Sequence, residues 1–242
     1  MNFVIPMAGH GKRFLHSGYE LPKMLIEAHG KTLLQWSLDS LPLRLCTNLV
    51  FVGLKEHETK YHISGRVKSL YGHVPLLQFD FLEEPTRGQA ETVLKAEDLL
   101  ILERPLLIFN IDTYFKSSTL EKQLLRTDID GVLGAFKNNS ERYSFAQLDN
   151  NGNVYRVVEK EPISDNALTG LYHFKQTVDY LEVAKMAIMN NEKSKGEFYI
   201  APLYNKLIEK GKKFVLDFVE EQYILGTPEE LAIFKETYRP RQ

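Results

Sequence analysis

The chain places an apolar run directly before a loop rich in glycine and positive charge: Phe3-Val4-Ile5-Pro6-Met7-Ala8-Gly9-His10-Gly11-Lys12-Arg13-Phe14. The run Phe3–Pro6 has the length and composition of a buried strand. Glycine lets backbone N–H groups turn toward an anion, and Lys12 and Arg13 add fixed positive charge. Lys23 follows a short distance along the chain. The segment therefore predicts a strand that leads into a polyphosphate-binding loop.

Apolar runs of strand length alternate with segments of helical periodicity in the first half of the chain. The spacing of leucines predicts helices over Lys31–Leu41 and Thr92–Leu102. Strands are expected at Phe3–Pro6, Leu49–Gly53, Leu76–Leu82 and Pro105–Phe109. Such alternation indicates a sheet that helices cover on both faces. We therefore predict an α/β fold, a Rossmann-like three-layer sandwich around a mixed, mostly parallel sheet.

After residue 128 the pattern changes to closely spaced strands that are followed by helices. Asp149-Asn150-Asn151-Gly152-Asn153 is a strong hairpin turn signal, and Thr227-Pro228 is typical of a helix start. Strands are expected at Gly131–Phe136, Tyr143–Leu148, Tyr155–Val158, Leu168–Phe174 and Lys213–Val219, and helices at Thr177–Met189, Phe198–Ile208 and Pro228–Tyr238. Without repeats or linkers, the chain predicts one domain over 1–242, in which 129–242 forms an antiparallel flap over 1–128.

The composition and net charge of the chain exclude some classes of function. The 242 residues carry a formal net charge of −2, which argues against a nucleic-acid partner. Cys46 is the only cysteine, so it excludes an internal disulfide, and its apolar neighbours predict a buried structural role. No basic leader and no apolar run of about 20 residues is visible, so we expect no membrane partner and a cytoplasmic location.

Three loops should meet at the carboxyl edge of the predicted sheet: Ala8–Phe14, Glu83–Gly88 and Asn110–Phe115. Asp112 lies just past a buried strand, where a carboxylate is costly unless it meets a cation. Mg²⁺ prefers one or two carboxylates together with phosphate oxygens and water. Asp112 is therefore a candidate metal ligand, and the alternative is a turn or N-cap role before Thr113.

In order and spacing, these segments resemble the sugar-phosphate nucleotidyltransferases, whose fold is also seen in one class of glycosyltransferases. The resemblance begins with Gly9-His10-Gly11-Lys12-Arg13, Pro22-Lys23-Met24-Leu25 and Gly30-Lys31-Thr32-Leu33-Leu34. It continues through Gly88-Gln89-Ala90-Glu91-Thr92, Phe109-Asn110-Ile111-Asp112, Val158-Glu159-Lys160, Gly170-Leu171-Tyr172-His173-Phe174, Gly196-Glu197-Phe198-Tyr199 and Gly226-Thr227-Pro228-Glu229. It covers nearly the whole chain, and no single element is specific.

The resemblance implies that a sugar 1-phosphate attacks the α-phosphate of a nucleoside triphosphate and releases pyrophosphate, with Mg²⁺ or Mn²⁺ as cofactor. The product would be a nucleotide-activated sugar for a surface polysaccharide. Arg13, Lys23 and Asp112 would be catalytic, with Asp112 also the metal ligand. The nucleotide would be bound within 1–128 by Met7, Ala8, Gly9, His10, Gly11, Lys12, Arg13, Lys23, Glu84, Gly88 and Gln89. The sugar phosphate would be bound mainly from 129–242, by Asn110, Glu159, Lys160, Gly170, Tyr172 and Glu197.

Simpler interpretations of some of these residues stay open. Lys160 suits a solvated hairpin between two glutamates, and Glu83 and Glu84 suit the exposed end of a strand. His57 and His62 are five apart on a probable helix, a spacing that does not suit a metal site.

One position departs from the resemblance. Several relatives carry a second metal carboxylate two residues before the Gly-Thr pair, where this chain has Ile224. Either Asp112 holds the metal with water, or Asp217, Glu220 or Glu221 substitutes, or metal binding is weakened.

Two other functions are compatible with the same residues. Asn110-Ile111-Asp112 suits a variant of the D-x-D motif in a glycosyltransferase that consumes a nucleotide sugar. That reaction does not require the glycine-rich loop together with Lys23. A non-catalytic sensor or assembly subunit is the third hypothesis, motivated by Ile224, and a homo-oligomer is compatible with all three.

Overall fold

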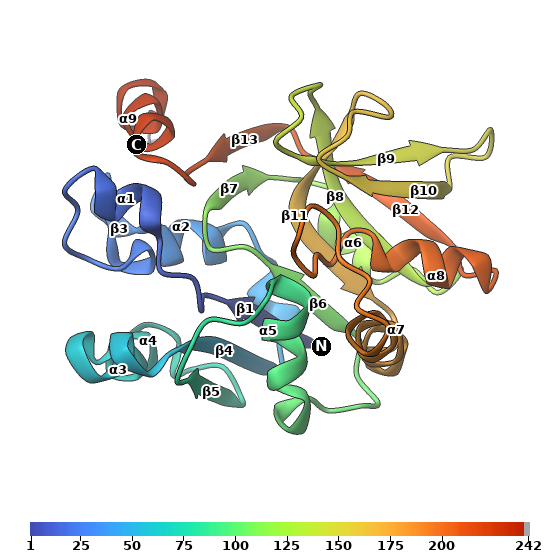
Figure 1. Ribbon diagram of the computed structural model, residues 1–242. Coiled ribbons are helices and arrows are strands. Elements are labelled where there is room, and N and C mark those ends of the chain that lie inside the picture. The colour runs from blue at the N-terminus through green and yellow to red at the C-terminus, as the bar shows by residue number, and fades with distance from the viewer. Residues whose placement is uncertain (240–242) are drawn as a thin grey trace.

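Strand β1 (Asn2–Pro6) pairs in parallel with β6 (Leu106–Phe109) and β4 (Asn48–Leu54), and β4 pairs in parallel with β5 (Leu77–Leu82). The four strands belong to a nine-stranded sheet in the computed structural model, which describes residues 1–239 (Figure 1). Residues 240–242, the end of the expected domain 1–242, lie outside the described residues. The four predicted strands and the predicted α/β class are confirmed.

Side chains of the parallel strands alternate between the two faces of the sheet, as the pleat requires. On β1, Val4 packs in one core, and Phe3 and Ile5 pack in the other. Helices α5 (Gln89–Lys95), α7 (Thr177–Met189) and α8 (Leu203–Glu209) cover the face of Val4. The opposite face is covered by α2 (Leu33–Asp39), α3 (Lys55–Tyr61), α4 (Ile63–Tyr71) and α6 (Leu120–Leu124). The predicted three-layer sandwich is confirmed.

Strand β11 (Asn166–Phe174) pairs antiparallel with β6 and so joins the second half of the chain to the sheet. The remaining strands of the sheet are β8 (Gly131–Lys137), β9 (Ser144–Leu148), β10 (Val154–Glu159) and β12 (Phe214–Phe218). The predicted antiparallel flap over the first half is therefore wrong, because these strands extend the same sheet. All nine residues of β11 are buried, and a strand buried on both faces needs neighbours and layers that a flap would not provide.

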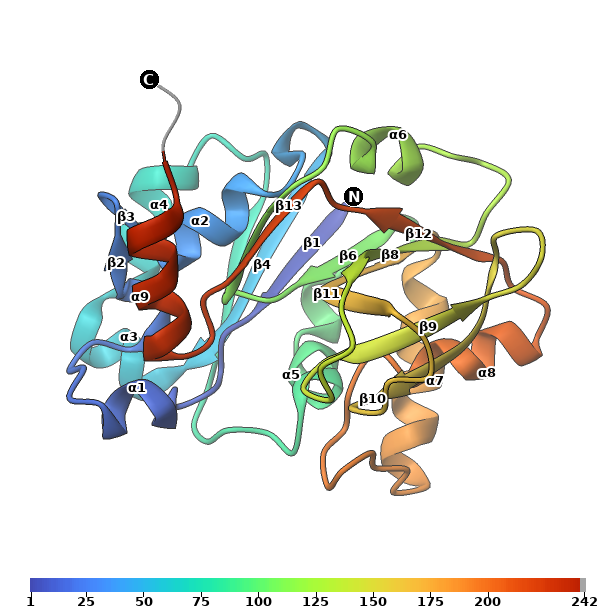
Figure 2. The same ribbon diagram turned by 90° about the horizontal axis from the view of Figure 1, so that it is seen from above.

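Two of the short strands that were not predicted pair with each other. β7 (Thr113–Lys116) pairs antiparallel with β13 (Glu221–Ile224), which places Ile224 opposite Thr113. Their sequences show no apolar alternation, and the sequence indicates only a loop at Asn110–Phe115. Seen from above, β13 leads from β12 across to α9 (Pro228–Thr237) (Figure 2). The pairing brings the C-terminal segment against the turn that holds Asp112.

Helix α2 is shorter than the prediction Lys31–Leu41. A small hairpin of β2 (Glu27–Ala28) and β3 (Lys31–Thr32) precedes it, and the Thr32 hydroxyl accepts a hydrogen bond from the N–H of Gln35 in a capping box. The cap fixes the helix start at Leu33.

The predicted helix Thr92–Leu102 is also wrong in its bounds, since α5 spans Gln89–Lys95. Asn2 and Asn48, from β1 and β4, donate side-chain hydrogen bonds to the carbonyls of Ile101 and Leu99 at 2.8 and 2.9 Å. Carbonyl groups held from the sheet do not continue a helical ladder.

The predicted helix Phe198–Ile208 begins later, at Leu203 in α8. The Phe198 N–H donates to Arg87 O and its carbonyl accepts from Ala90 N, so this residue is extended against α5.

Of two smaller predictions, one is wrong and the other is confirmed. The single helix expected to carry His57 and His62 is two helices, because His62 adopts a left-handed conformation between α3 and α4. Cys46 is buried as predicted, and burial raises the pKa of its thiol to about 11.

Among the described residues, no helix combines the length and hydropathy that crossing a bilayer would need.

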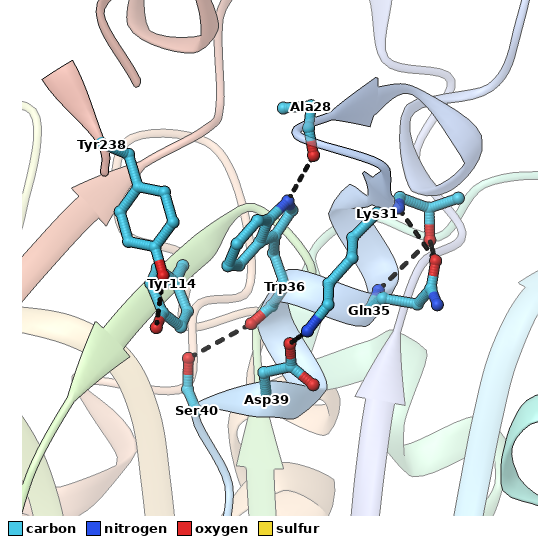
Figure 3. A network of polar contacts seen from close by, with 9 residues as sticks. Ala28, Lys31, Gln35, Trp36, Asp39, Ser40, Tyr114 and Tyr238 are labelled. Carbon is cyan, nitrogen blue, oxygen red and sulfur yellow. Dashed lines mark hydrogen bonds and ion pairs between the residues drawn. The ribbon is translucent and has the colours of Figure 1, made fainter. Parts of the chain in front are cut away.

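An aromatic cluster fixes α9 against the first half of the chain (Figure 3). The Trp36 ring lies 4.8 Å from Tyr114, 5.2 Å from Phe234 and 5.0 Å from Tyr238 between centroids. The Trp36 indole N–H donates to Ala28 O at 2.8 Å. Because Trp36 lies on α2, Tyr114 on β7 and Phe234 on α9, the cluster holds α9 against α2 and against the strand that follows the turn of Asp112.

Candidate active site

Lys23 and Asp112 form an ion pair at the carboxyl edge of the parallel strands. Lys23 begins a short 3-10 helix, Lys23–Leu25, and Asp112 lies in the turn between β6 and β7. The distance from Lys23 Nζ to Asp112 Oδ2 is 2.5 Å. The two residues, singled out separately in the sequence, therefore occupy one site.

The environment of Asp112 favours its charged form. Burial alone would raise the pKa of this carboxyl, but the charge and hydrogen bond of Lys23, with a smaller effect of Arg13, hold the pKa below its usual value. The Asp112 carbonyl accepts a hydrogen bond from Leu225 N at 2.7 Å. Lys23 thus holds the ionised carboxylate, and Leu225 fixes the main chain of the same residue.

The glycine-rich loop leaves β1 and turns at Gly11 into the short helix α1 (Lys12–His16). A Cβ at Gly11 would lie 3.4 Å from Lys23 Cβ, so the loop passes directly beside this lysine. Lys12 and Arg13 are exposed. Positive charge from two separate segments therefore gathers around Asp112.

A cavity of about 500 Å³ opens next to Asp112, and we name it the Lys160 cavity. Its lining comes from the loops of both halves of the chain. The lining residues that the sequence predicted are Arg13, Gln89, Asn110, Asp112, Glu159, Lys160, Gly170 and Tyr172.

Lys160 directly follows β10 in a conformation that is rare for its residue type, with φ of +54°. Its N–H donates to Tyr143 O, and Nζ donates to the Tyr199 hydroxyl at 2.5 Å. Burial alone would lower the pKa of Lys160, but the Tyr199 contact and the nearby carboxylates of Glu159 and Glu197 raise it. A strained, charged lysine is therefore held pointing into the cavity rather than solvated on a hairpin.

Glu159, the last residue of β10, is buried beside Lys160. The Ser144 hydroxyl donates to its carboxylate. Burial raises the pKa of Glu159, and the Ser144 contact and Lys160 oppose this shift. A carboxylate placed in this way can accept hydrogen bonds from the hydroxyl groups of a ligand.

A second cavity, of about 530 Å³, lies along the end of β1, and we name it the Gly9 cavity. Predicted residues in its lining are Ala8, Gly9, Gly88, Gln89 and Glu197. Gln89 lines both cavities, and its amide donates to the Asn110 side chain. The two cavities therefore meet at one glutamine, at the N-terminal end of α5.

Other predicted residues lie outside the two linings. The Met7 side chain is buried, and His10 points away, with Nδ1 3.1 Å from Glu56 of α3. Glu84 is exposed at a separate depression next to Glu83. Gly11, Lys12 and Lys23 are absent from both linings, although Lys23 contacts Asp112.

Several lining residues were missed by sequence reasoning. Arg142, before β9, forms an ion pair with Glu230 in the first turn of α9, and both line the Lys160 cavity. Tyr199 is the last residue of the quoted Gly196-Glu197-Phe198-Tyr199 motif but was not assigned a role. The sequence signal available for Arg142 was its position between Glu141 and Tyr143, directly before β9.

The three carboxylates considered as substitutes at Ile224 have other partners. Asp217 accepts from the Ser117 and Thr119 hydroxyls at 2.7 and 2.6 Å. Glu220 accepts from the backbone of Ser118, and Glu221 pairs with Lys116. None of the three lines the Lys160 cavity, whereas Ile224 does.

The arrangement suits a cation that is bound partly by a ligand. Within residues 1–239, no three His, Cys, Asp or Glu side chains are grouped as in a metal centre made by protein alone. Asp112 is ionised and faces a polar cavity, and Glu230 Oε2 is buried without a hydrogen-bond partner among the described residues. This donor set fits Mg²⁺, which takes few carboxylates together with phosphate oxygens.

Comparison with known proteins agrees with this geometry. The family model described as nucleotidyl transferase matches residues 3–232. The crystal structure of a nucleoside-diphosphate-sugar pyrophosphorylase from Vibrio cholerae RC9 is similar with a TM-score of 0.84 and 33% identity. The match covers 97% of this chain and 100% of that chain.

More distant structures share the fold. A putative glucose-1-phosphate thymidylyltransferase from Bacillus anthracis has a TM-score of 0.79 at 17% identity, covering 100% of this chain and 96% of that chain. A UDP-glucose pyrophosphorylase has a TM-score of 0.76 at 17% identity, with 98% and 97% covered. The bifunctional protein GlmU of Campylobacter concisus is 27% identical over 235 residues, 93% of this chain. The chain spans about half, 50%, of the length of that curated relative.

Proposed function

The chain belongs to the nucleotidyl transferase family, and from this premise we propose that it condenses a nucleoside triphosphate with a sugar 1-phosphate or a related phosphorylated precursor. The products are a nucleotide-activated sugar and pyrophosphate. The activated sugar then serves surface polysaccharide synthesis. The name of the Vibrio cholerae relative, a nucleoside-diphosphate-sugar pyrophosphorylase, supports this activity class.

One observation carries the proposal: two cavities share Gln89 in their linings, and Asp112, which pairs with Lys23, lines one of them. A reaction between two substrates needs two adjoining sites with the reacting groups between them. A glycosyltransferase also has two substrates, but the glycine-rich loop and Lys23 suit a triphosphate.

At the nucleotide end, the Gly9 cavity takes the nucleoside, and the loop with Gly9, Gly11 and Arg13 holds the β- and γ-phosphates. Backbone N–H groups and fixed cations are the donors that bind polyphosphate. Gly88 and Gln89 line this cavity, which supports their assignment to the nucleoside side.

At the sugar end, Lys160 neutralises the phosphate of the second substrate, and Glu159 accepts hydrogen bonds from the hydroxyl groups of the sugar. Tyr172, Asn110 and Gly170 complete the wall against which the sugar lies. The Tyr199 contact keeps Lys160 extended into this space.

In the reaction, a phosphate oxygen of the sugar 1-phosphate attacks the α-phosphorus and forms a new P–O bond. The bond from the α-phosphorus to the bridging oxygen breaks, and pyrophosphate leaves with the electron pair. Lys23 stabilises negative charge that develops on the α-phosphate oxygens, an electrostatic contribution of the kind that dominates such transfers. Mg²⁺, or Mn²⁺ in its place, supplies further positive charge to the phosphates when it is bound, and Asp112 would hold it.

The test is pyrophosphate release from each common nucleoside triphosphate paired with a panel of sugar 1-phosphates. We expect one preferred pair, activity that EDTA abolishes, and a loss of kcat/KM of about 100-fold or more in Lys23→Ala. Lys31→Ala is the matched control, since Lys31 forms an exposed ion pair with Asp39 at 2.6 Å, outside both cavities. Absence of pyrophosphate with every pair would contradict the proposal. Turnover only of a nucleotide sugar with Mn²⁺ would favour the glycosyltransferase instead.

A further inference from the structure

A carboxylate oxygen without a partner lies on the wall of the Lys160 cavity. Glu230 Oε1 pairs with Arg142, whereas Glu230 Oε2 is buried and accepts no hydrogen bond from the described residues. A buried carboxylate oxygen without a donor is costly, and most such groups in proteins are satisfied by a donor, a water or an ion. Glu230 therefore lacks one interaction that a ligand can supply.

The unpartnered oxygen faces the same point as Asp112. A Cβ placed on Gly226 would lie 3.2 Å from Asp112 Oδ2 and 3.3 Å from Glu230 Oε2. The two oxygens thus approach one glycine from different elements, the β6–β7 turn and helix α9. Gly226 leaves open the space that any larger residue would fill.

Hydrogen bonds fix the main chain that carries the two carboxylates. Leu225 N donates to the Asp112 carbonyl at 2.7 Å, and Glu230 N donates to the Thr227 hydroxyl at 3.2 Å. Arg142 holds the other oxygen of Glu230. The orientation of Glu230 is therefore set before a ligand binds.

We infer that Glu230 is the second carboxylate of the divalent-cation site and shares with Asp112 the Mg²⁺ ion that accompanies the triphosphate. This inference rests on the proposed function. It resolves the departure at Ile224, because the missing carboxylate comes from the first turn of α9 rather than from β13. Arg142 is a positioning residue for Glu230.

The test measures metal binding without turnover. Mn²⁺ is titrated by electron paramagnetic resonance, alone and with the α,β-methylene analogue of each common nucleoside triphosphate, whose α–β linkage the reaction cannot break. Glu230→Gln keeps the shape of the side chain and should weaken Mn²⁺ binding about tenfold or more. Gly226→Ala, which keeps both carboxylates but fills the space between them, should also weaken it.

Two controls separate the metal role from other effects. Glu229→Gln removes the neighbouring exposed carboxylate from the same helix turn and should leave Mn²⁺ affinity within about twofold, because both glutamates interact alike with the helix dipole. Arg142→Gln breaks the ion pair that positions Glu230 but keeps the Glu230 carboxylate, so it should weaken Mn²⁺ binding less than Glu230→Gln does.

The outcomes distinguish this inference from the proposed function. Unchanged Mn²⁺ affinity in Glu230→Gln, with pyrophosphate release intact in the wild type, would overturn the inference alone. A raised KM for sugar phosphate with unchanged Mn²⁺ affinity would make Glu230 a substrate ligand and overturn it as well. If the wild type binds no Mn²⁺ with any analogue, the inference is overturned. The proposed function is tested separately, by the panel of pyrophosphate-release assays.

Discussion

At the scale of single residues, the Lys160 cavity depends on backbone conformations that most residues avoid. Lys160 has φ of +54°, and Gly170 on strand β11 has φ of +88°. A Cβ at Gly170 would lie 2.3 Å from Asn110 Nδ2. Close approach of backbone to the Asn110 side chain at this point requires glycine.

Gly170→Ala is expected to reduce both stability and activity. The methyl group would displace Asn110 and its contact with Gln89, in addition to the strain of about 1–2 kcal/mol for a left-handed alanine. Gly152→Ala is the matched control, because Gly152 has φ of +80° but no atom within 4 Å of the added Cβ. Chemical denaturation and kcat/KM check this. Gly152→Ala should lose only the stability that corresponds to the backbone strain, and its kcat/KM should stay that of the wild type. Equal effects of the two variants would contradict the role of Asn110.

At the scale of elements, helix α9 completes the site although it is the last element of the chain. Its N-terminal turn brings Thr227 and Glu230 to the Lys160 cavity, and its other end brings Tyr238 to the aromatic cluster. Trp36 is the only tryptophan and is 4% exposed within that cluster. Its fluorescence therefore reports on how α9 is docked.

Tyr238→Ala is expected to lower the free energy of unfolding by about 3 kcal/mol or more, because a buried ring leaves a cavity. Trp36 emission should shift to longer wavelength, since its ring loses a neighbour 5.0 Å away and becomes hydrated. Tyr238→Phe removes only a hydroxyl that lies 3.5 Å from the Tyr114 hydroxyl, so it should cost about 1 kcal/mol or less. Tyr155→Ala, at a tyrosine that is 50% exposed, should leave the emission unchanged. Unaltered emission in Tyr238→Ala would contradict the docking role of the cluster.

At the scale of the whole molecule, a histidine buried in the sheet links stability to pH. His173 on β11 is 3% exposed, and neither ring nitrogen has a hydrogen-bond partner among the described residues. Burial lowers the pKa of His173 from 6.5 to about 3. The folded protein therefore keeps the ring neutral, while the unfolded chain binds a proton below pH 6.5.

The contribution of His173 to the free energy of unfolding should accordingly fall by about 1.4 kcal/mol for each pH unit below 6.5, until the folded ring itself titrates near pH 3. His173→Leu removes this contribution, so its stability should fall less steeply over the same range. His62→Asn, at an exposed histidine with a left-handed backbone, should keep the wild-type slope. Urea denaturation between pH 7.5 and about pH 4.5 tests this. Parallel slopes for wild type and His173→Leu would contradict it.

Much of the fold could be predicted because its elements have local causes. The runs of β1, β4 and β6 are apolar on both faces, and such runs predict buried parallel strands wherever they occur. Helix α7 was predicted with its observed bounds, Thr177–Met189, and Thr227 is the N-cap of α9 as expected. The predictions failed where side chains from elsewhere decided the local structure, as Asn2 and Asn48 do beyond α5.

By itself the sequence determined the layered α/β fold and most chemical groups of the candidate site, because apolar periodicity, glycine and charge act on their own neighbours. Only the tertiary structure decided which groups meet. Lys23 and Asp112 are 89 residues apart, and the pairing of β7 with β13 sets Ile224 opposite Thr113. Arg142 and Glu230 likewise meet across the cavity. Such contacts have no local signature, since their free energy is gained only after the sheet and α9 have brought distant segments together.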